Sequence, residues 1–584
     1  MPNTYYIDAN RGRDTNSGLS KDSAWQSLEA IRAKLLTGSV GPGDKFLFEA
    51  NSHFYPKRYL RIGSGVEPST YINGNSSNPI LFGKYDYNVK TNKKPKFTLN
   101  HTPKSSDWQW DATKNLWYWT YPQAYESNTL TWGHYPRVTI NGKLCQVVRF
   151  ESATFTRGVD PAGNLQVSVS QTTTPGRLYI WTPNASSNPS TNPTNVYGEG
   201  NIIAAGTGLA IFQFNRCGSY VNIKNLVSTE SGTLASPYND ASGTADIETF
   251  IVQDCESYDS GTFVVSGMVD NGKNINNLKL INNKIVRCVG GSFQGGSKNL
   301  LIKGNYLEGM NLGRSDGGGF YLTGAHTGFG GLIEDNTIVD AKYETGGCTT
   351  DGCAIYVETG TIGITVRRNV VANSPLALQD NSGKSSNMWH SNLIINCDKI
   401  ITITDQGSLA TTLTKTRFYH NTGINIGMNV NYPGMPTARF AAIACRKGSS
   451  RPASNYEYDI KNNIILGSGV AATQGYGILI EPGAVFTQAT NLISGFSVVK
   501  ADEYSFANAI TPPGTIMTNP NLLGSGRLSA GSSAIGVGTD TGLLLSDMDN
   551  SLFKVSAPNK PSIGCFEFYP LNELLYGYGS TVMN

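Results

Sequence analysis

Five acidic residues of this 584-residue chain have types and positions that suit bond cleavage: Asp316, Asp351, Glu358, Asp380 and Asp405. Carboxylates about 5 Å apart repel each other, so the pKa of one must rise. A protonated carboxyl beside an ionised one is the pair that cleaves glycosidic bonds, with the ionised group as a nucleophile at about 5 Å or a base at about 6.5–9.5 Å. We therefore predict that these five acids are catalytic.

Three of the acids lie in a segment that the sequence repeats between residues 305 and 360. One copy begins at Asn305 and the next at Asn336. A motif that recurs at this period marks a repeat architecture. The aligned pairs are Asp316 with Asp351, Phe320 with Ile355, Tyr321 with Tyr356, Leu322 with Val357 and Thr323 with Glu358.

The repeat extends along the middle of the chain, where an Asn, once replaced by Asp, precedes short apolar runs in a basic unit of 22 to 23 residues. Such units without helical periodicity predict parallel strands whose coils stack about 4.8 Å apart. Stacked amides can form a hydrogen-bonded ladder. The predicted fold class is all-β, a right-handed parallel β-helix. The recurring residues are Asn225, Asp254, Asn283, Asn305, Asn336, Asn369, Asn392, Asn421, Asn463 and Asn491.

The alternation of apolar residues predicts which acids share a surface. In the repeated segment it directs Tyr321, Tyr356 and Glu358 to the outer face of the coil. In the coils of Asp380 and Asp405 the alternation is shifted by one residue. These two acids reach the surface of Glu358 only if a bulge or a turn restores the register.

Two polar columns, seven residues apart in sequence, are predicted to run up one face of the solenoid. Asp before Gly is common turn chemistry, so a turn is the alternative interpretation of Asp316 and Asp351. The other members that are not predicted to be catalytic are expected to be turn residues. The columns are Asp259, Arg287, Asp316, Asp351, Asn373 and Asp398, and Ser266, Gln294, Thr323, Glu358, Asp380 and Asp405.

The N-terminal region, residues 1–95, is predicted to form a cap and the first coils. Tyr5–Ala9 has the composition of a strand. Ser27 is expected to cap a short helix with Leu28, Ile31 and Leu35 on one face. Such a helix would cover the open core at the end of a solenoid.

Both ends of the chain carry a family resemblance. The segments Tyr5–Gly18, Ala24–Leu28 and Gly43–Phe48 resemble the start of pectate-lyase-like β-helix proteins that act on polysaccharides. Asn519–Gly538 and Ile563–Phe568 are similar to the closing segment of such chains. The resemblance implies a β-helix fold and a polysaccharide substrate.

Residues 96–200 interrupt the repeat and contain six of the eight tryptophans. Alternating segments with Gly and Pro turns predict a small inserted antiparallel β-domain. Its tryptophans either serve as stacking platforms for sugar rings or fill the core of the insert. Residues 201–495 are predicted to form the central β-helix with the active groove. Residues 496–584 are expected to close the stack or mediate oligomer contacts.

Composition excludes several classes of protein. A net charge of +3 lacks the basic excess of a nucleic-acid partner. We find no apolar stretch for membrane insertion and no signal peptide. Most of the nine cysteines are expected to be buried thiols, although Cys348 and Cys353 could form a bridge. The sequence has no ligand spacing for a metal, and we expect no cofactor.

A lyase could use the same groove. Elimination next to a uronic carboxyl needs a base and a cation, roles open to five residues: Tyr321, Tyr356, His326, Lys342 and Arg314. The predicted substrate-binding set consists of Tyr321, Tyr356, His326, Arg314 and Trp389. The excess of acids favours hydrolysis, since a negative groove repels a uronate polymer. A non-catalytic glycan-binding adhesin is the third hypothesis.

Free thiols, a missing signal peptide and a Gly-rich solenoid suit a bacteriophage tailspike depolymerase of bacterial surface polysaccharide. The resemblance to such proteins implies a homotrimer in the virion tail that acts on the host surface. A secreted bacterial enzyme is the alternative.

Overall fold

A computed structural model describes most of the chain. The described residues are 1–56, 60–63, 71–120, 137–149, 166–170, 177–205, 210–239, 245–268, 274–310, 316–323, 330–341, 351–358, 361–382, 386–404, 414–427, 440–446, 456–468, 475–480, 485–502, 515, 518–551, 553 and 560–567. They form two compact units. The first takes in the described parts of Met1–Gly331 and Thr337–Thr361, and the second those of Leu332–Asn336, Ile362–Tyr432 and Pro436–Asn584.

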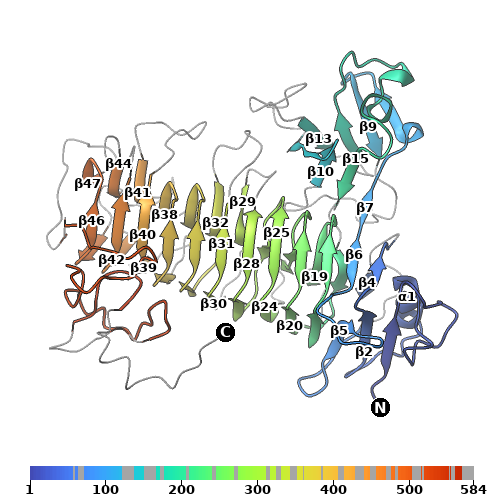
Figure 1. The fold of residues 1–584 in the computed structure, drawn as a ribbon, viewed down its shortest axis with the longest axis horizontal. Helices are drawn as coiled ribbons and strands as arrows, with labels where there is room; N and C mark the ends of the chain where they lie inside the picture. Colours follow the sequence, from blue (N-terminus) through green and yellow to red (C-terminus); the bar gives the residue numbers. More distant parts are fainter. Residues whose placement is uncertain are drawn as a thin grey trace. The chain divides into compact units, whose positions relative to one another are not determined.

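The described chain is mostly β-structure, with three long parallel sheets of 12 or 13 strands, here called sheets A, B and C (Figure 1). One coil takes one strand from each sheet in turn. β24 (Ile275–Ile281) of sheet A, for example, leads through two residues to β25 (Lys284–Cys288) of sheet B and then to β26 (Phe293–Gly295) of sheet C. The predicted right-handed parallel β-helix is confirmed.

The strand bounds follow the order of each sheet. Sheet A contains β1 (Thr4–Ile7), β2 (Lys45–Glu49), β5 (Ile80–Tyr85), β17 (Val221–Lys224), β20 (Ile247–Gln253), β24, β27 (Leu300–Lys303), β30 (Gly331–Glu334), β33 (Ile364–Arg367), β36 (Met388–His390), β39 (Thr414–Tyr419), β42 (Tyr456–Lys461) and β45 (Val485–Ala489). Sheet B contains β3 (His53–Phe54), β6 (Lys96–Thr98), β18 (Val227–Thr229), β21 (Glu256–Tyr258), β25, β28 (Tyr306–Met310), β31 (Thr337–Val339), β34 (Val370–Ala372), β37 (Leu393–Ile395), β40 (Thr422–Ile426), β43 (Ile464–Gly467) and β46 (Leu492–Ser494). Sheet C contains β4 (Leu60–Gly63), β16 (Ala210–Asn215), β19 (Thr233–Asn239), β22 (Val264–Val265), β23 (Gly267–Met268), β26, β29 (Asp316–Leu322), β32 (Asp351–Val357), β35 (Leu376–Asp380), β38 (Lys399–Thr404), β41 (Phe440–Arg446), β44 (Gly475–Ile480) and β47 (Val498–Asp502).

The predicted asparagine ladder lies in the two-residue turn between sheets A and B. In the second unit the amide of Asn392 donates to Asn421 Oδ1 at 2.9 Å, and the amide of Asn421 donates to Asn463 Oδ1 at 3.1 Å. The same contact joins Asn283 to Asn305 in the first unit at 2.9 Å. These side chains are at most 2% exposed, so the ladder satisfies buried backbone and amide groups.

The residue before each ladder position adopts the left-handed conformation, with φ of 58° at Asn225 and 54° at Asp254. The ladder prediction is therefore wrong by one residue in these two coils. There the ladder position is held by Leu226 and Cys255, and the backbone N–H of Cys255 donates to Asn283 Oδ1 at 2.9 Å. Asn and Asp suit both positions, because they tolerate positive φ and also bond locally, so spacing alone does not separate them.

Substitution of Asn421 by alanine is expected to lower the free energy of unfolding by about 2–3 kcal/mol, because the buried backbone and amide groups of Asn392 lose their acceptor. Urea denaturation followed by circular dichroism measures this change. Asn425→Gly is the matched control, since it removes an exposed bond from the Asn425 amide to Asn396 Oδ1. An equal loss for both variants would contradict a stabilising ladder.

The N-terminal helix matches its prediction. α1 (Leu28–Leu36) begins after Ser27, whose hydroxyl accepts from the backbone N–H of Glu29. Leu28, Ile31 and Leu35 are buried, which gives the helix one apolar face inside the first unit.

The inserted domain consists of two small sheets. One contains β7 (Asn100–His101), β10 (Arg137–Ile140), β11 (Lys143–Leu144) and β15 (Ile202–Ala205), and the other β8 (Trp108–Asp111), β9 (Leu116–Thr120), β12 (Gln146–Arg149), β13 (Gln166–Ser170) and β14 (Arg177–Ile180), with the short helices η1 (Ser105–Asp107), η2 (Pro189–Thr191) and α2 (Pro193–Tyr197). All described pairs are antiparallel except the parallel β12–β13 pair. Because β6 pairs within sheet B, the insert runs from β7 to β15 rather than over residues 96–200.

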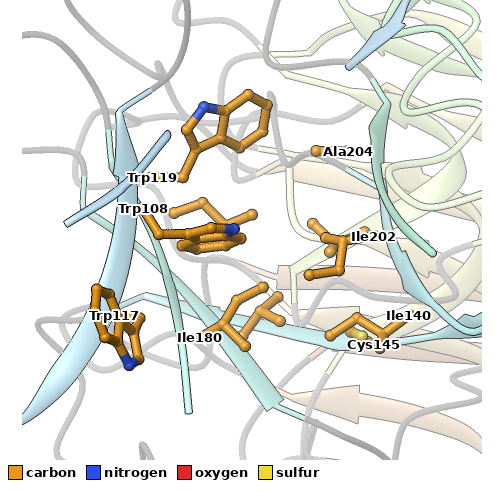
Figure 2. Close-up of a cluster of buried hydrophobic side chains, with 11 residues drawn as sticks. Trp108, Trp117, Trp119, Ile140, Cys145, Ile180, Ile202 and Ala204 are labelled. Carbon is orange, nitrogen blue, oxygen red and sulfur yellow. The ribbon is translucent and has the colours of Figure 1, made fainter. Parts of the chain in front are cut away.

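Three tryptophans of the insert fill its own core. Trp108, Trp117 and Trp119 are 4–6% exposed and pack with Ile140 and Ile180 (Figure 2). The indole of Trp108 also donates to the hydroxyl of Thr194 at 2.7 Å. Burial excludes these three rings as sugar platforms. Trp132 lies outside the described residues.

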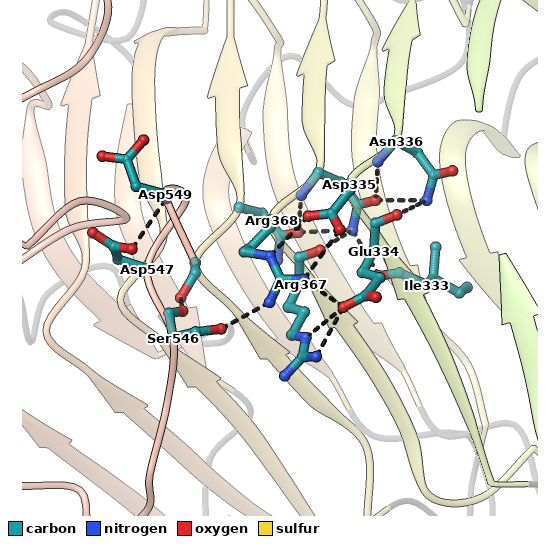
Figure 3. Close-up of polar contacts among 12 residues, drawn as sticks. Ile333, Glu334, Asp335, Asn336, Arg367, Arg368, Ser546, Asp547 and Asp549 are labelled. Carbon is teal, nitrogen blue, oxygen red and sulfur yellow. Dashed lines mark hydrogen bonds and ion pairs between the residues drawn. The ribbon is translucent and has the colours of Figure 1, made fainter. Parts of the chain in front are cut away.

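The C-terminal region packs against coils of the second unit. The hydroxyl of Ser546 accepts a hydrogen bond from Arg368 Nη1 at 2.8 Å (Figure 3). The backbone carbonyl of Ser546 accepts one from the hydroxyl of Ser391 at 2.6 Å. Farther along the row of left-handed residues, Asn462 and Thr539 exchange hydrogen bonds of 2.7 and 2.8 Å. The backbone of Cys565 donates to the hydroxyl of Thr422 at 2.9 Å. The described residues of 518–567 thus pack against this row of turns, while the coils continue to Asp502 in β47.

Two buried histidines predict a pH-dependent stability of the second unit. Burial lowers the pKa of His390 and of His420 to about 3. An unfolded histidine has a pKa of about 6.5, so between these values the unfolded chain binds protons that the folded chain does not. The free energy of unfolding is therefore lost as the pH falls below about 6.5. Burial of Asp547 opposes this loss of stability at low pH, because it raises the pKa of that carboxyl to about 6.

The variant His420→Asn isolates one of these groups, since Asn occupies the equivalent left-handed position at Asn462. The stability advantage of the parent over this variant is expected to shrink by about 2 kcal/mol between pH 7 and pH 5. Urea midpoints at the two pH values measure it, and the contribution of Asp547 is common to both proteins. A difference that stays constant with pH would contradict a buried neutral His420.

Candidate active site

The repeated segment forms two paired strands of sheet C. β29 and β32 are parallel and in the predicted register, with Asp316 opposite Asp351 and Tyr321 opposite Tyr356. The backbone N–H of Glu358 donates to the carbonyl of Leu322 at 2.8 Å, which extends the pairing by one residue. The sequence alignment of the two segments is therefore confirmed as the structural register.

Two phenols hold the carboxylate of Glu358. The hydroxyl of Tyr321 donates to Oε2, and that of Tyr356 donates to Oε1 at 3.4 Å. The two rings pack with centroids 4.8 Å apart and an interplanar angle of 31°. Hydrogen bonds to a carboxylate favour its ionised form. Glu358 is partly exposed, so this arrangement suits a fixed nucleophile or base.

The tyrosines themselves are not surface platforms. Tyr321 is 4% exposed and Tyr356 is 2% exposed. This corrects the prediction that both residues lie on the outer face and bind substrate, because neither ring is open to solvent. Their hydrogen bonds make them positioning residues for Glu358.

Asp316 and Asp351 lie at the other end of the same strands. An extended strand rises about 3.3 Å per residue, so the seven steps from Asp351 to Glu358 span about 23 Å. A glycosidase pair needs about 5–9.5 Å, which excludes either aspartate as the partner of Glu358. The three acids do not form one site. Because Asp316 and Asp351 pair in register, a dyad of these two alone stays a prediction.

The predicted polar columns do not form as single rows, although several of their members are turn residues. Asp259, Arg287 and Asn373 are left-handed turn residues, as expected, with φ of 53–56°. Asp259 binds Arg287 and also Arg137 of the insert, with an Arg137 Nη2 to Oδ1 distance of 3.0 Å. Asp259, Arg287 and Asn373 lie in turns, so they do not share a column with Asp316, which lies in a strand of sheet C.

Asp380 is a buried structural acid rather than a surface group. It is 2% exposed and accepts hydrogen bonds from the Ser382 hydroxyl at 2.6 Å and from the Asn387 amide at 3.2 and 3.3 Å. Burial raises the pKa of this carboxyl. Asp380 has the same parity as the buried Leu376 and Leu378, and no bulge turns it outward. Its predicted catalytic role is therefore wrong.

Trp389 is also wrongly predicted as a substrate-binding residue. It is fully buried, and its indole N–H donates to Asp380 Oδ2 at 3.1 Å. Its strand neighbours Val366 and Phe418 are buried as well. Trp389 thus belongs to the core of the second unit.

Several predicted residues lie outside the described parts of the chain. These are Asp405, His326, Arg314, Lys342 and Cys348. All eight described cysteines are buried, Cys353 among them. Within the described residues, no group of His, Cys, Asp and Glu could hold a metal ion, and no helix is long and apolar enough to cross a membrane.

Comparisons with known proteins agree on the fold. No protein-family model and no curated protein matches the chain. A solved structure described as the complex of XylC with xylose aligns with a TM-score of 0.51 and 12% identity over 97% of this chain and 98% of that one. This likeness shows the fold alone.

Two other similar structures have lower scores. Pectate lyase Pel9A has a TM-score of 0.36 and 13% identity over 97% of this chain and 96% of its own. The GH136 lacto-N-biosidase from Eubacterium ramulus has 0.35 and 12% over 88% and 68%. One is named as a lyase and the other as a glycosidase.

Proposed function

We propose that this protein degrades a polysaccharide by glycoside hydrolysis, with Glu358 as the ionised carboxylate. The observation that carries this proposal is the pair of phenols on the two oxygens of a partly exposed Glu358. They fix the side chain and favour the charge that a nucleophile or base needs. Tyr321 and Tyr356 position this group and do not contact the sugar.

The proposed substrate is a bacterial surface polysaccharide. A β-helix offers a long outer face on which a chain of sugars can bind at several places, and the likeness to the xylose complex of XylC supports this fold. The acid that protonates the leaving group must lie about 5–9.5 Å from Glu358. Asp316 and Asp351 do not meet this requirement.

Elimination by a lyase is the alternative, because the carboxylate that Tyr321 and Tyr356 hold in place could itself act as a base. In that reaction Glu358 would abstract the proton next to a uronic carboxyl. Product analysis separates the two reactions. Hydrolysis yields new reducing ends without the near-ultraviolet absorbance of a conjugated double bond, whereas elimination yields both. Binding without any new reducing ends would instead support an adhesin.

A further inference from the structure

Three tyrosines of the first unit, two in strands of sheet B and one directly after β3 of that sheet, are each hydrogen-bonded to a side chain two residues away. The hydroxyl of Tyr55 bonds His53 Nδ1 at 2.9 Å, and that of Tyr306 bonds Glu308 Oε2 at 2.9 Å. The hydroxyl of Tyr258 bonds Glu256 Oε2 at 2.7 Å. Residues two apart on a strand point to the same face, so each bond runs along the outer surface of the sheet.

This bonding pattern lays the rings against the sheet. A phenol whose oxygen reaches the side chain two positions away lies along its strand. The Nζ of Lys284 lies over the Tyr258 ring, 5.9 Å from its centroid. The Tyr55 ring packs over His53, with centroids 4.1 Å apart. Tyr55 is 68% exposed and Tyr306 is 37% exposed, while Tyr258 is half-buried. These bonds add little to folding, because exposed hydrogen bonds and charged contacts contribute little.

The spacing of the tyrosine rings suits a linear chain of sugar rings rather than one small molecule. Glu256 pairs with Lys284, and Lys284 pairs with Tyr306, so Tyr258 and Tyr306 lie on strands two coils apart. β25 and β28 lie side by side in Figure 1. Two coil steps separate these strands by about 10 Å. Tyr55 follows β3, three strands before β21 in the same sheet.

We propose that this outer face of sheet B is a second polysaccharide-binding surface, separate from Glu358 on sheet C. The apolar face of a pyranose packs on an exposed aromatic ring, and rings fixed before binding lose little freedom on binding. Glu256, Lys284 and Glu308 lie among the rings and can bond sugar hydroxyls. A second copy of the chain is a poorer occupant, since Lys and Glu are depleted from the cores of protein interfaces. The inference shares the substrate class of the proposed function but not its catalytic step.

The test is affinity electrophoresis of the full chain through gels that contain one of three bacterial polysaccharides: bacterial alginate, xanthan or gellan. All variants carry Glu358→Gln, so the probe stays intact. Tyr55→Ala with Tyr306→Ala is expected to weaken retention by about tenfold in the gel that retains the parent. Tyr55→Phe with Tyr306→Phe keeps the rings and should retain most of the binding. Tyr71→Ala removes a 50% exposed tyrosine that precedes β5, outside this face, and should change nothing.

Three outcomes would overturn the inference: no retention of the parent by any of the three gels, equal retention of the double alanine variant, or a change in its mass by light scattering. The last would make the face a contact between copies. Failure of the proposed function is a separate result. It would be seen as full cleavage activity of Glu358→Gln, and retention that depends on the rings would still support the second surface.

Discussion

Substitution of Glu358 by glutamine is expected to lower the rate of polysaccharide cleavage by about 10³-fold or more while the fold is retained. Glutamine has nearly the same shape and can still bond Tyr321 and Tyr356, but it has no charge with which to act as a nucleophile or base. Release of reducing ends, measured at equal protein concentration, gives the size of the effect. Circular dichroism and the melting temperature show whether the fold is unchanged.

Glu248→Gln is the matched control for this experiment. Glu248 lies in β20 of the same unit, is also partly exposed, and accepts a 2.6 Å hydrogen bond from the amide of Asn276. The control should cleave at the parent rate. If both variants keep full activity, Glu358 has no part in the chemistry.

Substitution of Asp380 by alanine is expected to destabilise the second unit by about 3–5 kcal/mol. The change leaves the buried donors of Ser382, Asn387 and Trp389 without their acceptor and opens a cavity beside the indole. Urea denaturation followed by tryptophan fluorescence and circular dichroism measures the loss.

Asp380→Asn distinguishes a structural from a catalytic role. The amide keeps the volume and one acceptor oxygen, so this variant should lose less stability than the alanine variant and still cleave polysaccharide. A folded asparagine variant without cleavage activity would restore Asp380 to the catalytic set. An alanine variant as stable as the parent would contradict the buried network.

Repetition made much of the fold predictable. The spacing of the asparagines gave the length of a coil, and the alignment of Asp316 with Asp351 gave the register of two strands. The same alternation gives Asp380 the parity of the inward-facing Leu376 and Leu378. An outward-facing Asp380 would need a bulge in this strand, and the strand pairs without one. Trp389 follows the same rule, since it aligns with Val366 and Phe418 of the core.

Other features depend on contacts that no short spacing reveals. Ser546 binds Arg368 across 178 residues of sequence, and Asn462 binds Thr539 across 77. Glu358 accepts hydrogen bonds from Tyr356, two residues before it in the chain, and from Tyr321, 37 residues before it. The sequence pattern showed that Tyr321 and Tyr356 alternate with the inward-facing residues of their strands. It did not show that both tyrosines are buried, because their burial depends on what covers the outer face of the sheet.

The position of bound sugar tests the central claim most directly. Crystals of Glu358→Gln, soaked with an oligosaccharide of the polysaccharide that the parent cleaves, would show where the scissile linkage lies. We predict that the anomeric carbon lies about 3–3.5 Å from the side chain at position 358, or is bridged to it by one water. An oligosaccharide whose scissile linkage lies against a different part of the molecule would contradict the account.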